Sequence, residues 1–299
     1  MKISRKIFPI VVLLAASTAV LAQNQNQQQI KIDEQKGFTE FETFQGTVNT
    51  DSRIFKIDST LGWDFNKYFG VFGGVPFYFA SVPSSTTTTG TTTGGTSNSG
   101  IGNVYAGMNF RAPNPKLDYA GALTVSAPTG STTNGLSTGR AGVDFTNRFA
   151  HSFDKFTPFV EAGAANTVPD TAFSTRPFTS LGAIGHFEEG GDYEVVKHTY
   201  FGASGYQIVP FGSQKVFSKL VDKGGQGGGG GKNPFDNNAV STGNNLTREN
   251  GFNAWVGFEP SPMWRAEVGF TRSMTFDLNS FAFNLRFNVG RMMRARKSS

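Results

Sequence analysis

Three histidines are the residues of this chain best suited to act as general bases, and the residues beside them decide what chemistry is available. A strand with His and Ser two positions apart presents both on one face, where His can activate Ser as a nucleophile against lipid at a bilayer surface. His151 is followed directly by Ser152, which faces the other side of a strand, and neither His186 nor His198 has a serine two positions on. None of the three fits, so the sequence predicts no enzyme and leaves a lipid hydrolase as a third alternative only.

Two further motifs carry chemistry in other proteins but lack the required context here. The run Gly224 to Lys232 is Gly-rich like a phosphate-cradling loop, but Asn233 and Pro234 follow it in place of Ser or Thr and a helix. We expect a flexible surface loop there, and we expect Glu188 and Glu189 to be a solvated pair at a turn. The chain has no cysteine, and its His, Asp and Glu residues form no cluster with ligand spacing. The sequence therefore predicts neither a metal nor a cofactor.

The first 22 residues have the features of a cleaved secretory signal. Lys2, Arg5 and Lys6 form a basic segment, residues 7–16 are apolar, and residues 20–22 end in a small residue before Gln23. Removing this segment takes away three basic residues and lowers the formal net charge from +5 to +2. The basicity that would favour a nucleic-acid partner then largely disappears. The chain contains 30 Phe and 37 Gly, and beyond the signal it has no apolar stretch long enough for a membrane-spanning helix, which indicates β-structure.

Apolar and polar residues alternate through most of the chain beyond residue 36, as they do in strands with one apolar face. In the last such segment Phe281, Phe283 and Phe287 alternate with Asn284 and Arg286. Followed along the chain, the alternation predicts about twelve strands, at residues 38–48, 52–65, 68–81, 101–111, 117–127, 139–150, 155–165, 178–188, 193–211, 251–259, 263–273 and 278–290.

The connections between these strands favour a membrane barrel over a soluble β-sandwich, which is the alternative fold. Short connections are expected near residues 66–67, 112–115, 152–155, 189–192 and 260–262, and long ones rich in Ser, Thr, Gly and Asn at 83–100, 128–138, 166–177 and 212–250. Short periplasmic turns that alternate with long extracellular loops are typical of outer-membrane barrels.

We therefore predict an all-β protein, a transmembrane antiparallel β-barrel of about 12 strands. Residues 1–22 are the signal peptide, 23–36 a Gln/Asn-rich periplasmic leader, 37–290 the outer-membrane barrel and 291–299 a basic periplasmic tail.

The polar faces of the predicted strands must point into such a barrel, because hydrocarbon offers polar groups no partner. Charges of both signs there either pair across the interior and stabilise a narrow barrel, or separate into zones that orient a solute; for any single residue we favour pairing. The inward aromatic residues Phe72, Tyr78, Tyr105 and Trp255 are candidates for a constriction. The lumen-facing charged candidates are Lys56, Asp58, Asp64, Arg111, Arg140, Asp144, Arg148, Glu161, Arg265, Glu267 and Arg286.

Three different segments follow one another along the chain: a strand-turn-strand unit that ends in a Val-Pro segment at 61–79, a Gly-led strand at 101–111, and a strand running into Pro-Thr-Gly at 123–130, followed by Gly135 to Gly139. Together they resemble the outer-membrane transporter-like family named after the meta-pathway of phenol degradation, over roughly residues 50 to 165. The resemblance implies passage of small, often hydrophobic or aromatic, compounds across the outer membrane. The Gly-rich run and the basic tail depart from the common pattern of that family.

The sequence thus predicts an outer-membrane β-barrel of a Gram-negative cell that serves as a passive channel or transporter for small solutes, hydrophobic or aromatic ones included. The alternative from another class is a non-conducting structural barrel that displays its long loops for surface interactions. The expected partners are membrane lipids, a small-molecule solute of unknown identity and the barrel-assembly machinery, with no nucleic acid; the oligomeric state stays open.

Overall fold

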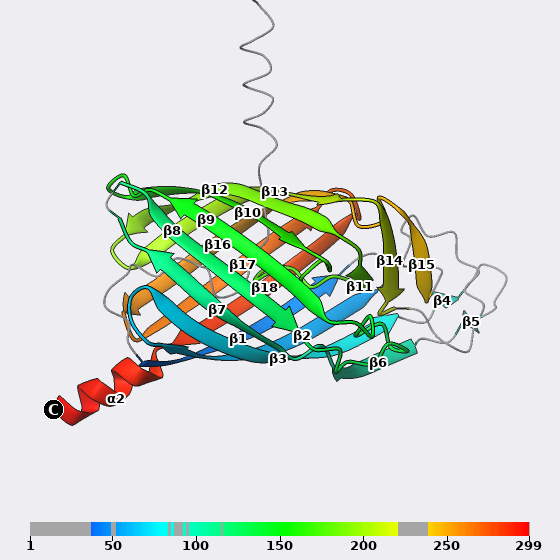
Figure 1. The fold of residues 1–299 in the computed structure, drawn as a ribbon, viewed down its shortest axis with the longest axis horizontal. Coiled ribbons are helices and arrows are strands. Elements are labelled where there is room, and N and C mark those ends of the chain that lie inside the picture. Colours follow the sequence, from blue (N-terminus) through cyan, green and yellow to red (C-terminus); the bar gives the residue numbers. More distant parts are fainter. Residues whose placement is uncertain are drawn as a thin grey trace, which may run out of the picture.

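Twelve antiparallel strands close into a barrel in the computed structural model, which describes residues 37–48, 52–82, 85–86, 92–93, 96–114, 116–220 and 239–298 (Figure 1). The expected signal, the leader and the Gly-rich run Gly224 to Lys232 lie outside these residues. The barrel strands are β1 (Gly37–Val48), β2 (Arg53–Asp64), β3 (Phe69–Val82), β7 (Tyr105–Ala112), β8 (Asp118–Ser126), β9 (Gly142–Ala150), β10 (Phe156–Ala165), β12 (Ile184–Val196), β13 (Thr199–Pro210), β16 (Glu249–Ser261), β17 (Trp264–Ser273) and β18 (Leu278–Phe287).

The barrel closes where the first strand meets the last. β1 pairs with β18 in a continuous antiparallel register from Glu40 opposite Phe287 to Val48 opposite Asn279, and its other edge pairs with β2. Strands β2 and β3 also pair, so every barrel strand has a neighbour on both sides. The predicted fold is confirmed.

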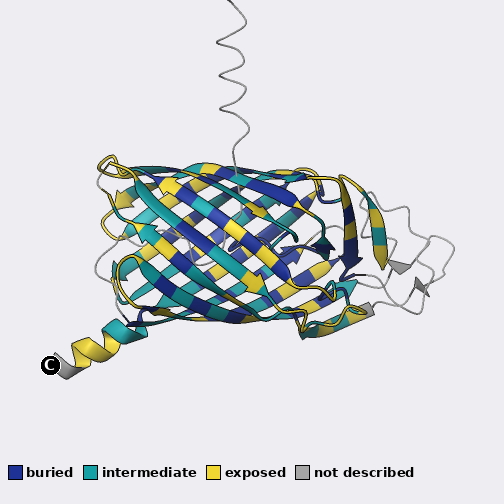
Figure 2. Ribbon diagram, viewed as in Figure 1, coloured by how far each residue is buried: buried dark blue, intermediate teal, exposed yellow. Residues whose placement is uncertain are grey.

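Burial alternates residue by residue along the strands, as Figure 2 shows. In β2 the side chains of Ile54, Lys56 and Asp58 are buried, whereas those of Phe55 and Leu61 are exposed. Because the sheet is closed, the buried face is the interior and the exposed face is the outer wall. A polar interior behind an apolar outer wall is the arrangement that lipid requires.

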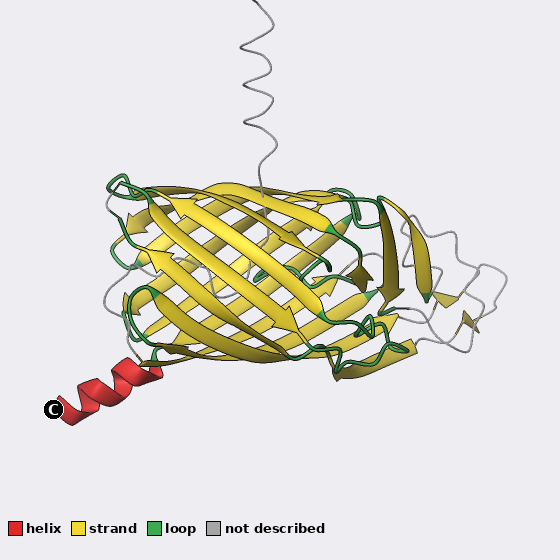
Figure 3. Ribbon diagram, in the orientation of Figure 1, coloured by secondary structure: helices red, strands yellow, loops and turns green. Residues whose placement is uncertain are grey.

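The long connections gather at one end of the barrel and carry strands of their own (Figure 3). There β11 (Phe178–Leu181), β14 (Ser213–Ser218) and β15 (Val240–Asn244) form a three-stranded sheet, and β6 (Thr96–Ile101) pairs with the end of β3. Short β4 (Ser85–Thr86) and β5 (Thr92–Thr93) pair with each other. The predicted loops 83–100 and 212–250 therefore contain strands, which their Ser-, Thr- and Gly-rich composition concealed.

One predicted turn is wrong. Residues 189–192 lie within β12, and the turn follows at Lys197 and His198, where His198 has a φ of 71°. The predicted strand 178–188 is divided by Gly182, whose φ of 146° ends β11. Gly190 and Gly191 of the predicted turn are strand residues that leave room for neighbours: a Cβ at Gly191 would lie 2.6 Å from the ring of Phe156.

Because β12 continues through residues 189–192, two adjacent carboxylates lie in a strand and not in a turn. Glu188 and Glu189 are not a solvated pair at a turn, because both lie in β12 and face opposite sides of the wall. Glu188 is fully buried in the interior, and Glu189 is exposed on the outer face.

The last strand ends earlier than predicted. β18 stops at Phe287, and Val289–Ser298 form the helix α2, which projects from the end of the barrel opposite the long connections (Figure 1). The Asn288 side chain accepts a hydrogen bond from the backbone N–H of Arg291 at 2.9 Å and so caps the helix N-terminus. Among the described residues, no helix has the length and apolar character needed to cross a membrane.

Candidate functional site

Residues 166–177, predicted as an extracellular loop, turn back into the barrel. Ala172, Phe173 and Thr175 have no exposed surface. The ring of Phe173 stacks on Trp255 of β16 with centroids 5.4 Å apart and an angle of 15°. It also lies where a side chain on Gly269 of β17 would be, since a Cβ there would approach the ring to 2.0 Å. This inward loop therefore fills part of the interior.

Hydrogen bonds fix the inward loop to the first and last strands. Gln45 donates to the carbonyl of Thr171, and the Thr175 hydroxyl donates to Gln45 Oε1 at 2.7 Å. The Thr47 hydroxyl donates to the carbonyl of Thr175 at 2.7 Å. The hydroxyls of Ser280 on β18 and Ser174 lie 3.1 Å apart.

A buried arginine anchors the end of the inward loop. Arg176 donates from Nε to Glu249 Oε2 at 3.0 Å, and only 2% of its side chain is exposed. Glu249 Oε1 accepts from the Tyr206 hydroxyl at 2.7 Å, so both of its oxygens have partners. The carbonyl of Arg176 accepts from Lys219 Nζ at 2.9 Å. Charges buried in this way are stable only when they are paired and hydrogen-bonded.

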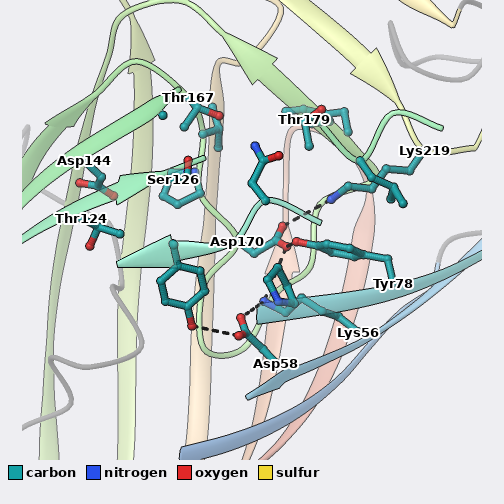
Figure 4. A pocket seen from close by; sticks show the side chains of 18 of the residues that line it. Lys56, Asp58, Tyr78, Thr124, Ser126, Asp144, Thr167, Asp170, Thr179 and Lys219 are labelled. Carbon is teal, nitrogen blue, oxygen red and sulfur yellow. Dashed lines mark hydrogen bonds and ion pairs between the residues drawn. The ribbon is translucent and has the colours of Figure 1, made fainter. Parts of the chain in front are cut away.

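Asp170 is the acidic centre of the same loop (Figure 4). Its carboxylate lies 3.6 Å from Lys56 Nζ and 3.9 Å from Lys219 Nζ, and it accepts from the Tyr78 hydroxyl at 2.6 Å and the Arg176 backbone N–H at 2.8 Å. Burial raises the pKa of Asp170, but Lys219 and Lys56 outweigh burial and lower it to about 2. Burial lowers the pKa of Lys219 to about 8 although Asp170 opposes this shift. We call Lys56, Asp170, Arg176, Lys219 and Glu249 the loop cluster.

A cavity of about 150 Å³ lies beside the loop cluster. Figure 4 shows Lys56, Asp170 and Lys219 along one side of it, and Thr124 and Ser126 across from them. Its lining also includes the rings of Tyr78 and Tyr105 and the hydroxyls of Thr167 and Thr179. The cavity is therefore lined by aromatic rings and by groups that donate and accept hydrogen bonds.

Ten of the eleven predicted lumen-facing charges lie on the interior face of barrel strands, and most are paired with one another. The ion pairs are Lys56 with Asp58 at 3.4 Å, Arg111 with Asp64 at 3.0 Å, Arg148 with Glu161 at 3.6 Å and Arg265 with Glu267 at 2.6 Å. Asp144 lies 3.0 Å from His186 Nε2, and Arg286 follows the inward Asn284 by two positions on β18. The eleventh predicted residue, Arg140, does not face the interior. It lies in an exposed bend before β9, because that strand begins three residues later than predicted.

The four predicted aromatic candidates all point inward, and three of them bind an acid or the inward loop. Tyr105 donates to Asp58 at 2.9 Å, Tyr78 donates to Asp170, and Trp255 stacks on Phe173. The ring of Phe72 lies 6.3 Å from that of Tyr105.

Sequence reasoning missed the interior residues that come from connections or from the misplaced strand: Asp170, Arg176, Lys219, Glu188, Asp192 and Glu249. The alternation of Gly251, Asn253 and Trp255, extended one step back, reaches Glu249 and provides a signal for that residue. The positions of Asp170 and Arg176 depend on where the loop folds, for which the local sequence has no periodic pattern. Among the described residues, no group of three or more His, Cys, Asp or Glu is placed to hold a metal ion.

Comparison with known proteins supports the fold but does not show a family. The sequence matches no family model and no curated protein. Among solved structures, an outer membrane channel from Pseudomonas putida F1 is similar with a TM-score of 0.53 at 12% identity, over 89% of this chain and 98% of that chain. The chain has the outer-membrane barrel fold.

Two other barrels are similar at a lower level. The transport unit of the autotransporter AIDA-I from Escherichia coli has a TM-score of 0.47 at 10% identity, over 93% of this chain and 96% of that chain. The KdgM porin has a TM-score of 0.46 at 7% identity, over 83% of this chain and 98% of that chain.

Proposed function

We propose that this barrel is an outer-membrane channel for the passive passage of small solutes, narrowed by the inward loop. The chemistry of the interior carries the proposal. An interior built for stability alone would be filled with apolar side chains, because burying ion pairs gains little stability. Here the inward face carries charged pairs, hydroxyls and a cavity of about 150 Å³ instead. Such a lining suits a path whose width and polarity select what passes.

The lining of the cavity bears on the solute. Tyr78 and Tyr105 line the cavity together with Thr167 and Thr179, so a single small ring with polar substituents matches the lining in size and chemistry. The resemblance of residues 61–79, 101–111 and 123–130 to the phenol-degradation family supports small aromatic compounds as the solute class. The outer membrane is the expected location, since the outward face is apolar and the sequence begins with an expected secretory signal.

The inward loop itself favours a second candidate, a non-conducting structural barrel that displays its loops. Ala172, Phe173 and Thr175 have no exposed surface, and a loop packed this tightly obstructs the interior. The two functions differ in whether the loop narrows a path or closes it.

Ion current across a planar bilayer separates the two candidates. We expect the wild-type protein to conduct and a Phe173→Ala, Arg176→Ala variant to conduct several-fold more, because both changes remove anchors of the loop. A variant with Thr132→Ala and Thr133→Ala, which are exposed in another connection, controls for general loop effects and should match the wild type. Absence of current from both the wild type and the loop variant would establish the structural barrel.

A further inference from the structure

One face of the interior has more acidic than basic side chains. The inward residues of β9, β10 and β12 include four carboxylates and one arginine: Asp144, Glu161, Glu188, Asp192 and Arg148. Elsewhere on the wall acids and bases alternate, as in the pairs of Lys56 with Asp58 and Arg111 with Asp64. We call these five residues of β9, β10 and β12 the acidic face.

Two carboxylates lie side by side in the middle of this face. Glu161 of β10 is directly opposite Glu188 of β12 in the strand register, and both have no exposed surface. Within the described part of the chain, neither oxygen of Glu161 has a hydrogen-bond partner, and one oxygen of Glu188 has none. The other oxygen of Glu188 accepts from Asn253 at 3.2 Å. Like charges directly opposite each other in a sheet are unfavourable, and burial increases the cost.

One arginine of the described strands serves both carboxylates of this pair and cannot balance the two together. Arg148 forms an ion pair with Glu161 at 3.6 Å, and its guanidinium lies 3.5 Å from the centroid of the Phe159 ring. His186 is engaged by Asp144 at 3.0 Å. Asp192 accepts from Trp255 Nε1 at 2.8 Å and is attracted by Arg265 of β17.

The aromatic rings beside the carboxylate pair already have partners. Arg148 lies over the Phe159 ring of β10, and Phe173 stacks on Trp255 of β16. The carboxylates are therefore the groups that would select for a cation, as paired carboxylates that line a path do.

We propose that the Glu161–Glu188 pair is a cation-binding step of the path, so that the barrel passes cations in preference to anions. This inference rests on the proposed channel function and specifies the charge of what that channel favours. Glu161 and Glu188 are then specificity-determining residues, while Arg148 limits how much positive charge the face attracts.

The reversal potential in a KCl gradient tests the proposal directly. We expect the wild type to favour K⁺ over Cl⁻, and Glu161→Gln with Glu188→Gln to reduce that preference several-fold. Glu189→Gln is the matched control, because it removes the same charge from the next residue of β12 on the outer face and should leave selectivity unchanged. Conduction without cation preference, or a preference that survives both substitutions, would overturn the cation site and leave the channel function intact.

A second measurement does not need current. The thermal unfolding midpoint of the wild type should be a few degrees higher in KCl than in N-methylglucamine chloride at equal ionic strength, because a bound ion stabilises the folded state. Glu161→Gln with Glu188→Gln should abolish this difference and Glu189→Gln should keep it. If no current is observed, the channel function fails, and the presence or absence of this K⁺ effect still decides the site.

Discussion

The loop cluster and the acidic face are both buried groups of charges inside one barrel, but they are built differently. In the loop cluster each carboxylate meets cations and hydrogen-bond donors: Asp170 has Lys56, Lys219 and Tyr78, and Glu249 has Arg176. On the acidic face the Glu161–Glu188 pair has one nearby cation, Arg148, and Arg265 of β17 attracts Asp192. A balanced group fixes the loop in one position at little net cost, whereas unbalanced carboxylates are costly to bury, a cost that the proposed cation would relieve. We infer that the contrast separates charges that hold the loop from charges that act on a solute.

The largest effect on stability is expected when Arg176 is removed. Arg176→Ala leaves Glu249 buried without its cation, and breaking such a pair costs about 3–5 kcal/mol. We expect the free energy of unfolding in urea to fall by that amount. Restoring balance with a second change, Glu249→Gln, should recover a large part of the loss. A fall of equal size in the double variant would mean that packing, and not charge balance, holds the loop.

The next effect is a pH dependence of the loop cluster. The pKa of Asp170 is about 2 in the folded protein against 3.8 for an ordinary aspartate. Its stabilisation is therefore complete above about pH 4 and is lost as the pH falls from about 4 to 2, a loss of about 2 kcal/mol. Urea unfolding at pH 6, 4 and 3 measures the decline. Asp170→Asn should flatten it, and an unchanged slope in that variant would remove Asp170 as the cause.

A change on the acidic face should have the opposite sign. Glu188→Gln keeps the size of the side chain and the acceptor for Asn253, and it leaves Arg148 balanced by Glu161. Relief of the like-charge contact should raise the free energy of unfolding by about 1 kcal/mol. Glu189→Gln on the outer face is the control. A loss of stability in Glu188→Gln would show that this carboxylate is balanced after all.

The smallest effect is expected where a polar group has spare partners. Ser280→Ala removes a hydroxyl 2.7 Å from Thr47 and 3.1 Å from Ser174. Thr47 still donates to the carbonyl of Thr175, so we expect a loss of about 0.5–1 kcal/mol and no change in current. A loss as large as that of Arg176→Ala would indicate that hydroxyls, rather than the ion pair, hold the inward loop.

The two regions also differ in how far the sequence predicts them. The wall follows from a period of two, so the alternation of residue types alone places Lys56, Asp58 and Glu161 inside the barrel. The same rule failed at Glu188 because a turn was predicted at residues 189–192. Local signals cannot tell that a strand glycine is kept for close packing against a neighbour such as Phe156.

The loop cluster could not be found in this way. Asp170, Arg176 and Lys219 lie in connections, and their partners Lys56 and Glu249 are distant in the sequence. A loop with Ser, Thr and Pro residues looks the same whether it points outward or folds back. Whether the loop folds inward depends on contacts such as that of Phe173 with Trp255, and these contacts exist only in the closed barrel.

The inward loop touches both strands of the closing seam, and this bears on the order in which the protein is assembled. Thr47 and Ser280 are 233 positions apart in the sequence, yet their hydroxyls meet beside Ser174 and Thr175. Without the final strand, β1 has an unpaired edge and the loop lacks its contact with Ser280. The complete set of loop contacts therefore requires the closed seam, and the loop acts as a clasp across β1 and β18. A truncated chain that lacks β18 loses the clasp and the seam together.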